Sequence, residues 1–180
     1  MISAQQTRRQ HLWSVLLIVG SVALSVGFAC ATPFAAFAAL AALTLPRNEA
    51  LMAAGGVWLA NQAVGFAFLH YPLTANCLGW GVALGVGIVI AALTAREVAS
   101  RLANTGPIAV GIAGFLAAFL AHQMSLLVIA AALLGGVEAF QPAIVERIFA
   151  VNAAAFVGLA AAGWFAERAG IIAPAKRRLA

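Results

Sequence analysis

Apolar residues follow one another along this chain in six long runs, separated by short segments that contain proline, glycine or charged residues. The runs cover residues 12–30, 32–45, 50–70, 77–95, 107–134 and 142–165. A helix needs about 20 apolar residues to cross the hydrocarbon core of a bilayer. The pattern predicts an all-α integral membrane protein in which six transmembrane helices form one bundle, with residues 1–180 as a single domain.

Two of the runs depart from the spanning length. The second is short, which favours a helix that is broken or packed inside the bundle. The fifth is long and must tilt, kink or project from the membrane, and we expect its weak point at 121–124, where His122 and Gln123 interrupt the apolar sequence. The first run lacks the small-residue cleavage site of a signal peptide and is expected to stay as a span.

The composition supports the membrane assignment and excludes several functions. Hydrophobic residues make up 64% of the chain and charged residues 8%, against about 25% charged residues in a soluble domain. The mean hydropathy is +1.03. The chain has no aspartate and no P-loop sequence, so a Ser-His-Asp triad is absent and any ATP-driven step requires a partner protein.

The basic residues predict the topology. Nine of the ten Lys and Arg residues fall in segments on one side of the six spans, which the positive-inside rule makes cytoplasmic, with both termini. Topology and anionic lipid account for the net charge of +5, so no nucleic-acid partner is expected. The nine residues are Arg8, Arg9, Arg47, Arg96, Arg101, Arg168, Lys176, Arg177 and Arg178.

Arg147 is the exception to this charge distribution, because it lies just inside the outer end of the sixth run. It is either a local partner of Glu146 or a snorkelling side chain at the interface, or it is a fixed donor for an anionic or amide-bearing ligand in an outward-facing pocket.

The third run carries a polar cluster of Trp58, Asn61 and Gln62. Adjacent amides point to different faces of a helix, so Asn61 and Gln62 are expected to form hydrogen bonds in different directions. Trp58 and Gln62 are four residues apart and share a face. They act either as polar contacts between helices or as the wall of a pocket.

The turn at 70–77 ends in Cys77 and also contains Tyr71 and Asn76, with Trp80 a turn further on. A free thiolate there would be a soft ligand on the outer side. Two other interpretations remain open, since cysteine is often a small buried apolar residue and a disulfide with Cys30 is conceivable.

Six spans, a short alanine-rich second span and outward polar residues make the whole chain resemble the S components of energy-coupling factor (ECF) vitamin transporters, and in particular the BtuM-like group. That group carries a cysteine between spans three and four and an arginine near the outer start of span six, which Cys77 and Arg147 match. The chain departs from the group's histidine near the end of span one and aspartate in span three, where it has Phe28 and Cys30, and Asn61 and Gln62.

The resemblance implies a subunit of the bacterial cytoplasmic (inner) membrane that binds a vitamin, most of all cobalamin, from the outer face. It implies Cys77 as the ligand of the cobalt, with reductive loss of cyanide from cyanocobalamin as an associated reaction. No intrinsic cofactor is expected, and the chain acts with an ECF transmembrane subunit and ATPases or alone. The candidate site residues are Cys77, Tyr71, Asn76, Trp80, Trp58, Asn61, Gln62, Phe140, Gln141 and Arg147.

Two other functions remain open. A transition-metal permease would use Cys30, Cys77, His70 and His122. A membrane assembly protein would instead bind a partner through its small-residue helix faces, such as the one that carries Ala35 and Ala39.

Overall fold

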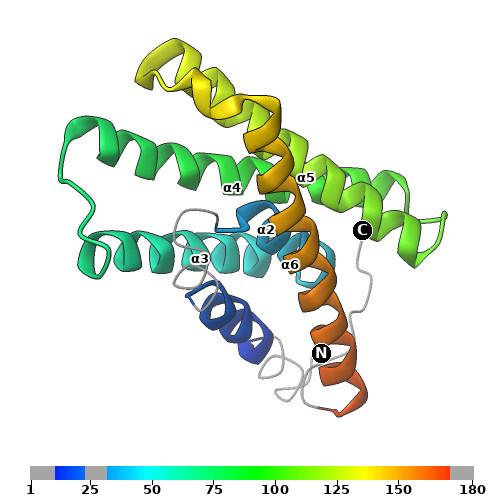
Figure 1. Ribbon diagram of the computed structural model, residues 1–180. Helices are drawn as coiled ribbons and strands as arrows, with labels where there is room; N and C mark the ends of the chain where they lie inside the picture. Colours follow the sequence, from blue (N-terminus) through cyan, green and yellow to red (C-terminus); the bar gives the residue numbers. More distant parts are fainter. Residues whose placement is uncertain (1–10, 23–31, 171–180) are drawn as a thin grey trace.

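The computed structural model describes residues 11–22 and 32–170, and every regular element in these two ranges is a helix (Figure 1). The first described helix, His11–Val22, precedes the labelled ones. The others are α2 (Phe34–Thr44), α3 (Arg47–Ala67), α4 (Ala75–Arg101), α5 (Pro107–Ile129) with the π-helical turn η1 (Ala130–Leu134), the short 3-10 helix η2 (Val137–Phe140) and α6 (Pro142–Arg168).

Four helical segments in the described ranges are long and apolar enough to cross a membrane. They are α3, α4, α5 together with η1, and α6. A helix of 27 residues, such as α4 or α6, is about 40 Å long, which exceeds the roughly 30 Å of hydrocarbon in a bilayer. The prediction of a helical membrane protein is therefore supported, while His11–Val22 and α2 are shorter apolar helices.

The short second run forms the centre of the structure, as its length predicts. Residues 34–42 of α2 are exposed by no more than 4%, and the helix packs against α3, α4, α5 and α6. Its alanines allow these neighbours to approach on every side. A helix that is apolar on all faces is typically buried among other helices, and α2 follows this rule.

Side chains from two other helices fix the C-terminal end of α2. The guanidinium of Arg96 donates to the carbonyl oxygens of Ala42, at 3.4 Å, and Leu45, at 3.0 Å. Trp13 Nε1 donates to Thr44 Oγ1 at 2.9 Å. The start of the first described helix and the ends of α2 and α4 therefore lie together at one end of the bundle, here called the basic end.

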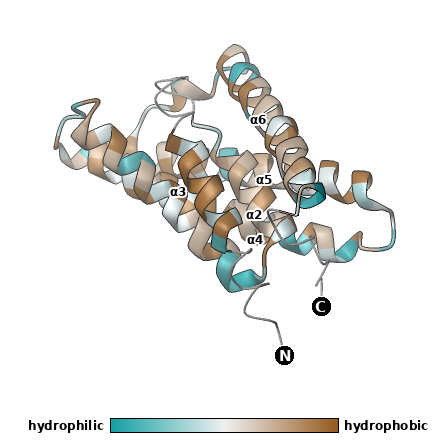
Figure 2. Ribbon diagram, turned by 90° about the horizontal axis from the view of Figure 1, so that it is seen from below, coloured by the Kyte–Doolittle hydropathy of each residue, from teal (hydrophilic) through white to brown (hydrophobic). Residues whose placement is uncertain are grey.

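The opposite end, here called the turn end, holds the connection 68–74 between α3 and α4 and the connection 135–141 between α5 and α6. Asn76 Nδ2 donates to the Leu134 carbonyl oxygen at 2.9 Å, which joins the start of α4 to the end of the fifth helical segment. Figure 2 shows hydrophobic colours along most of the helix lengths and hydrophilic colours mainly near helix ends and connections.

The weak point expected at 121–124 is wrong. The α-helical geometry of α5 continues through these residues to Ile129, because His122 and Gln123 are buried inside the bundle and leave the backbone hydrogen bonds intact. The helix changes to π geometry only at 130–134, where Gly135 N donates to the Ala130 carbonyl at 2.8 Å. Gly135 and Gly136 then end the segment with φ values of 75° and 85°, which glycine adopts most readily.

Candidate functional site

The α3–α4 connection folds back onto α3. His70 has a φ of 53°, and the Tyr71 backbone N–H donates to the Gly65 carbonyl at 3.0 Å. The Tyr71 ring lies so close over Gly65 that a Cβ there would be 2.6 Å from two ring carbons, and it meets the Phe66 ring edge-on at 6.1 Å. Tyr71 is thus held against α3, with its ring partly exposed.

Cys77 lies in the first turn of α4. Thr74 is the N-cap residue, and its hydroxyl accepts a hydrogen bond from the Cys77 backbone N–H at 3.2 Å. The thiol is free and half-buried, and it stands at the N-terminus of α4. Cys30, the other half of the conceivable disulfide, lies outside the described residues.

Asn76 and Trp80 join the start of α4 to the α5–α6 connection. They are four residues apart and share a face of α4. Asn76 bonds the Leu134 carbonyl, and the Trp80 ring reaches Gly136, where a Cβ would lie 3.6 Å from it. Cys77 therefore lies beside the contacts that the first turns of α4 make with the end of η1 and with the α5–α6 connection. In the second connection, Phe140 is half-buried and Gln141, the N-cap residue of α6, is exposed.

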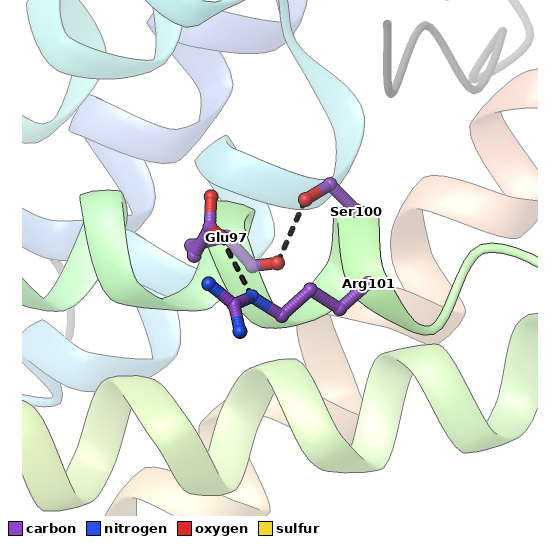
Figure 3. A network of polar contacts seen from close by, with 3 residues as sticks. All are labelled: Glu97, Ser100 and Arg101. Atoms are coloured by element: carbon purple, nitrogen blue, oxygen red, sulfur yellow. Dashed lines mark hydrogen bonds and ion pairs between the residues drawn. The ribbon is translucent and has the colours of Figure 1, made fainter.

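Arg147 is exposed in the second turn of α6. It forms no ion pair within the described ranges, where the sole ion pair joins Arg101 Nε to Glu97 Oε1 at 2.7 Å, at the basic end (Figure 3). The local pairing considered for Arg147 and Glu146 is therefore not formed. Arg147 also forms no hydrogen bond with Cys77 within those ranges, and its place in the second turn of α6 puts its backbone near the turn end.

Trp58 and Gln62 pack against glycines of α4. Trp58 Nε1 donates to the Gly81 carbonyl at 2.7 Å, and a Cβ at Gly85 would lie 2.8 Å from the indole ring. A Cβ at Gly81 would lie 2.6 Å from Gln62 Oε1. Two large residues four apart on α3 thus face two glycines four apart on α4, which is close packing between helices.

The adjacent amides do not form their hydrogen bonds independently. Asn61 Nδ2 donates to Thr32 Oγ1 at 2.6 Å, and Gln62 Nε2 donates to Asn61 Oδ1 at 3.4 Å. The two amides donate to different partners, as expected, and the partner of the longer Gln62 side chain is its own neighbour, Asn61. The chain of contacts leads from α3 to the segment just before α2.

Asn152 is a structural residue that the sequence analysis did not single out. It is buried on α6, where its Oδ1 accepts from the Ala36 backbone N–H at 3.1 Å and its Nδ2 donates to the Ile148 carbonyl at 2.9 Å. Ala36 lies in the first turn of α2, whose N–H groups have no partner within the helix. The sequence gives one indication of this role: Asn152 is a single amide in an otherwise apolar stretch of the sixth run.

The polar side chains lie at different depths between the two ends. α2 has 11 residues and its C-terminal end lies at the basic end, so its first residue, Phe34, lies about 16 Å inside the bundle. Gly81, which contacts Gln62, and Gly87, which contacts the His122 ring, lie about 9 Å and 18 Å from the start of α4. Thr32, Asn61 and Gln62 thus lie between α2 and the turn end. α2 occupies the half of the bundle that is next to the basic end.

Metal ligation by several residues has no support in the described ranges, which contain no group of three or more His, Cys, Asp or Glu side chains able to hold a metal ion. Comparison with known proteins gives no match to a family model, a curated protein or a solved structure. The long apolar helices suggest a multi-pass membrane protein. Its described residues include one free thiol, Cys77, which lies at the turn end of the bundle.

Proposed function

We propose that this protein is a transporter subunit of the S-component type that captures a vitamin, cobalamin above all, from the outer face of a bacterial cytoplasmic membrane. The bundle has six spans with both termini cytoplasmic, and the turn end faces outward. The four spanning-length helices supply four of these spans. We assign the other two to the first and second apolar runs, whose described helices, His11–Val22 and α2, are shorter.

The observation that carries the proposal is the grouping of Asn76, Cys77 and Trp80 in the first two turns of α4 beside the α5–α6 connection. An amide, a soft sulfur and an aromatic ring are the groups that suit a large, amide-rich ligand with a metal centre. The basic residues Arg96 and Arg101 lie at the opposite end, which supports an outward turn end by the positive-inside rule.

Each side chain has a distinct role in this proposal. The Cys77 sulfur binds the cobalt as an axial ligand, the Trp80 ring covers an apolar part of the corrin, and Arg147 donates to an amide or phosphate oxygen of the ligand. Phe140, Gln141 and Tyr71 border the site. Trp58, Asn61 and Gln62 support it from below, since their polar atoms already bond α4, Thr32 and one another.

Reductive loss of cyanide is a separate expectation from binding, since it needs an electron donor outside this chain. Energy for uptake is separate as well. The chain has no P-loop sequence, so ATP-driven uptake requires an ECF transmembrane subunit and ATPases. Uptake assays in cells with and without such a module distinguish this arrangement from independent action.

Calorimetry with cyanocobalamin on the purified full chain tests the proposal. We expect binding by the wild type, a loss of affinity of about tenfold or more in Cys77→Ala, and no change in Ser100→Ala, an exposed substitution at the basic end of the same helix. Arg147→Ala should weaken binding without lowering the thermal unfolding midpoint. A wild type that binds no cobalamin contradicts the proposal, and unchanged affinity in Cys77→Ala removes the ligand assignment.

A further inference from the structure

His122 is a buried titratable side chain that the proposed vitamin site does not use. It is 7% exposed, and its neighbour Gln123 is 9% exposed. The Nε2 atoms of both side chains are buried without a hydrogen-bond partner. A buried polar atom without a partner destabilises the folded state, so two adjacent ones require an explanation beyond packing.

The imidazole lies halfway between the two ends of the bundle. Its ring stacks on Phe34, the first residue of α2, with ring centroids 5.9 Å apart. A Cβ at Gly87 of α4 would lie 3.2 Å from Cδ2 of the imidazole and 3.4 Å from Nε2, so the ring packs closely against a glycine of α4, which offers the nitrogen no side-chain partner. Gln123 carries an amide with both donor and acceptor atoms next to it.

Every other titratable or charged group on the elements packed around His122 lies near a helix end. α2 has none, and α5 has none besides His122. The remaining groups all fall within six residues of a terminus of their helix: Cys77, Arg96, Glu97 and Arg101 on α4, Glu146, Arg147, Glu167 and Arg168 on α6, and Arg47 and Glu49 on α3. In the described part of the chain, His122 is thus the one such group at mid-depth of a helix.

We propose that His122 is a proton-binding site in the middle of the bundle and that uptake through this protein is coupled to protons there. Histidine is the side chain that changes charge near neutral pH, and ionisable groups inside a membrane are costly and mark ion and proton pathways. One proton binds Nε2 from the turn end and leaves toward the basic end. The imidazole returns to its neutral form, and no other bond changes.

The position of Phe34 supplies a reason for coupling. Protonation puts a cation against the N-terminal end of α2, where the helix dipole is positive, and this contact is unfavourable. Proton binding therefore biases the packing of α2, which lies below the Thr32–Asn61–Gln62 contacts. The binding of a ligand between α2 and the turn end is then coupled to the binding of the proton, and each changes the affinity for the other by the same factor. This coupling step rests on the proposed transport function.

Thermal unfolding of the full chain in detergent tests proton binding without any vitamin. Acidification from about pH 7 to about pH 5 should lower the wild-type midpoint, because the imidazole takes up a proton more readily in the unfolded chain than inside the bundle. His122→Gln should lose roughly half or more of this shift, whereas His11→Gln, at an exposed histidine, should keep it. His122→Asn serves if the Gln variant does not fold. An equal acid shift in wild type and His122 variants overturns the proposal.

Proteoliposomes with a pH-sensitive dye inside test the coupling, with cyanocobalamin as the probe. Wild type and His11→Gln should acidify the lumen as cobalamin enters, and His122→Gln should lose this signal several-fold. Cobalamin uptake without proton entry in the wild type overturns the coupling while the proposed function stands. A wild type that neither binds nor transports cobalamin contradicts the proposed function, and the unfolding experiment then decides proton binding alone.

Discussion

α2 and α6 are both apolar helices of one bundle, yet they are packed in opposite ways. Nine of the 11 residues of α2 are buried, whereas α6 buries only Asn152 and Gly163 among its 27 residues. α2 is the more apolar of the two, because it has no charged residue and α6 has four. Side-chain size and length separate them further, because a short alanine-rich helix admits neighbours on all sides, while large side chains such as Trp164 and Phe165 of α6 face the surroundings that lipid would fill.

The buried helix α2 stabilises the bundle, whereas the candidate ligand groups lie in other parts of the molecule. α2 is a rigid centre held at both ends, by Asn152 at its start and by Arg96 and Trp13 at its end. The candidate ligand groups lie elsewhere, at the start of α4 and in the connections of the turn end. Substitutions in α2 should therefore lower stability, and substitutions at Cys77 should alter binding without lowering stability.

The largest effect is expected from removing the biggest buried ring of α2. Phe37→Ala leaves a cavity at a fully buried position and should lower the free energy of unfolding by about 3–5 kcal/mol. Phe165→Ala on α6, at a side chain that is 64% exposed, should have little effect. The measurement is thermal unfolding in detergent, and equal losses in the two variants would refute the contrast between the helices.

Asn152→Ala tests the one polar contact that links the two helices. It leaves the buried Ala36 N–H without its acceptor and should cost about 1–3 kcal/mol. Asn76→Ala, which removes an exposed hydrogen bond to Leu134, should cost less. Hydrogen exchange of the α2 amides should increase in Asn152→Ala. If it does not, Asn152 does not hold the start of α2.

Two glycines of α6 make a matched pair that tests the contact of this helix with Trp13. A Cβ at Gly163 would lie 2.9 Å from the Trp13 ring, whereas Gly158 has open space around it. Gly163→Ala should destabilise by about 1–3 kcal/mol because the indole must shift. Gly158→Ala should be neutral or stabilise by about 0.5–1 kcal/mol through helix propensity. The unfolding midpoints decide, and a reversed order would show that α6 is not packed through Gly163.

The smallest effect is expected at the exposed pair of Glu97 and Arg101. Their side chains are 60% and 76% exposed, and exposed pairs four residues apart on a helix contribute about 0.3–0.5 kcal/mol. Glu97→Gln should therefore change the midpoint very little, and the change should disappear at high salt. A large loss of stability would mean that the basic end is held by surface charge as well as by packing.

The run pattern predicted the helical class and the central position of α2. The alanine repeats and the short length of the second run can be read from the sequence alone, and small side chains allow neighbouring helices to approach closely. The charge pattern likewise anticipated that Arg47, Arg96 and Arg101 lie at the end of the bundle opposite the α3–α4 connection, since a short connection between two long helices leaves their other ends together.

The rest depended on partners far away in the chain. Asn152 meets a residue 116 positions earlier, and nothing in its own neighbourhood identifies that partner. The His122–Gln123 segment resembled a helix break because its residues are polar, yet burial among apolar helices kept it helical. The π-helical turn at 130–134 and the bent Gln62 side chain likewise result from packing against other segments.

Visible absorption of the purified protein with bound cobalamin tests the central claim most directly. If the Cys77 sulfur binds cobalt, the wild-type spectrum should differ from that of free cobalamin, because the axial ligand has changed, and the Cys77→Ala spectrum should match that of the free vitamin. Ser100→Ala should retain the wild-type spectrum. Identical spectra for wild type and Cys77→Ala, each with cobalamin bound, would contradict the assignment of Cys77 as the ligand.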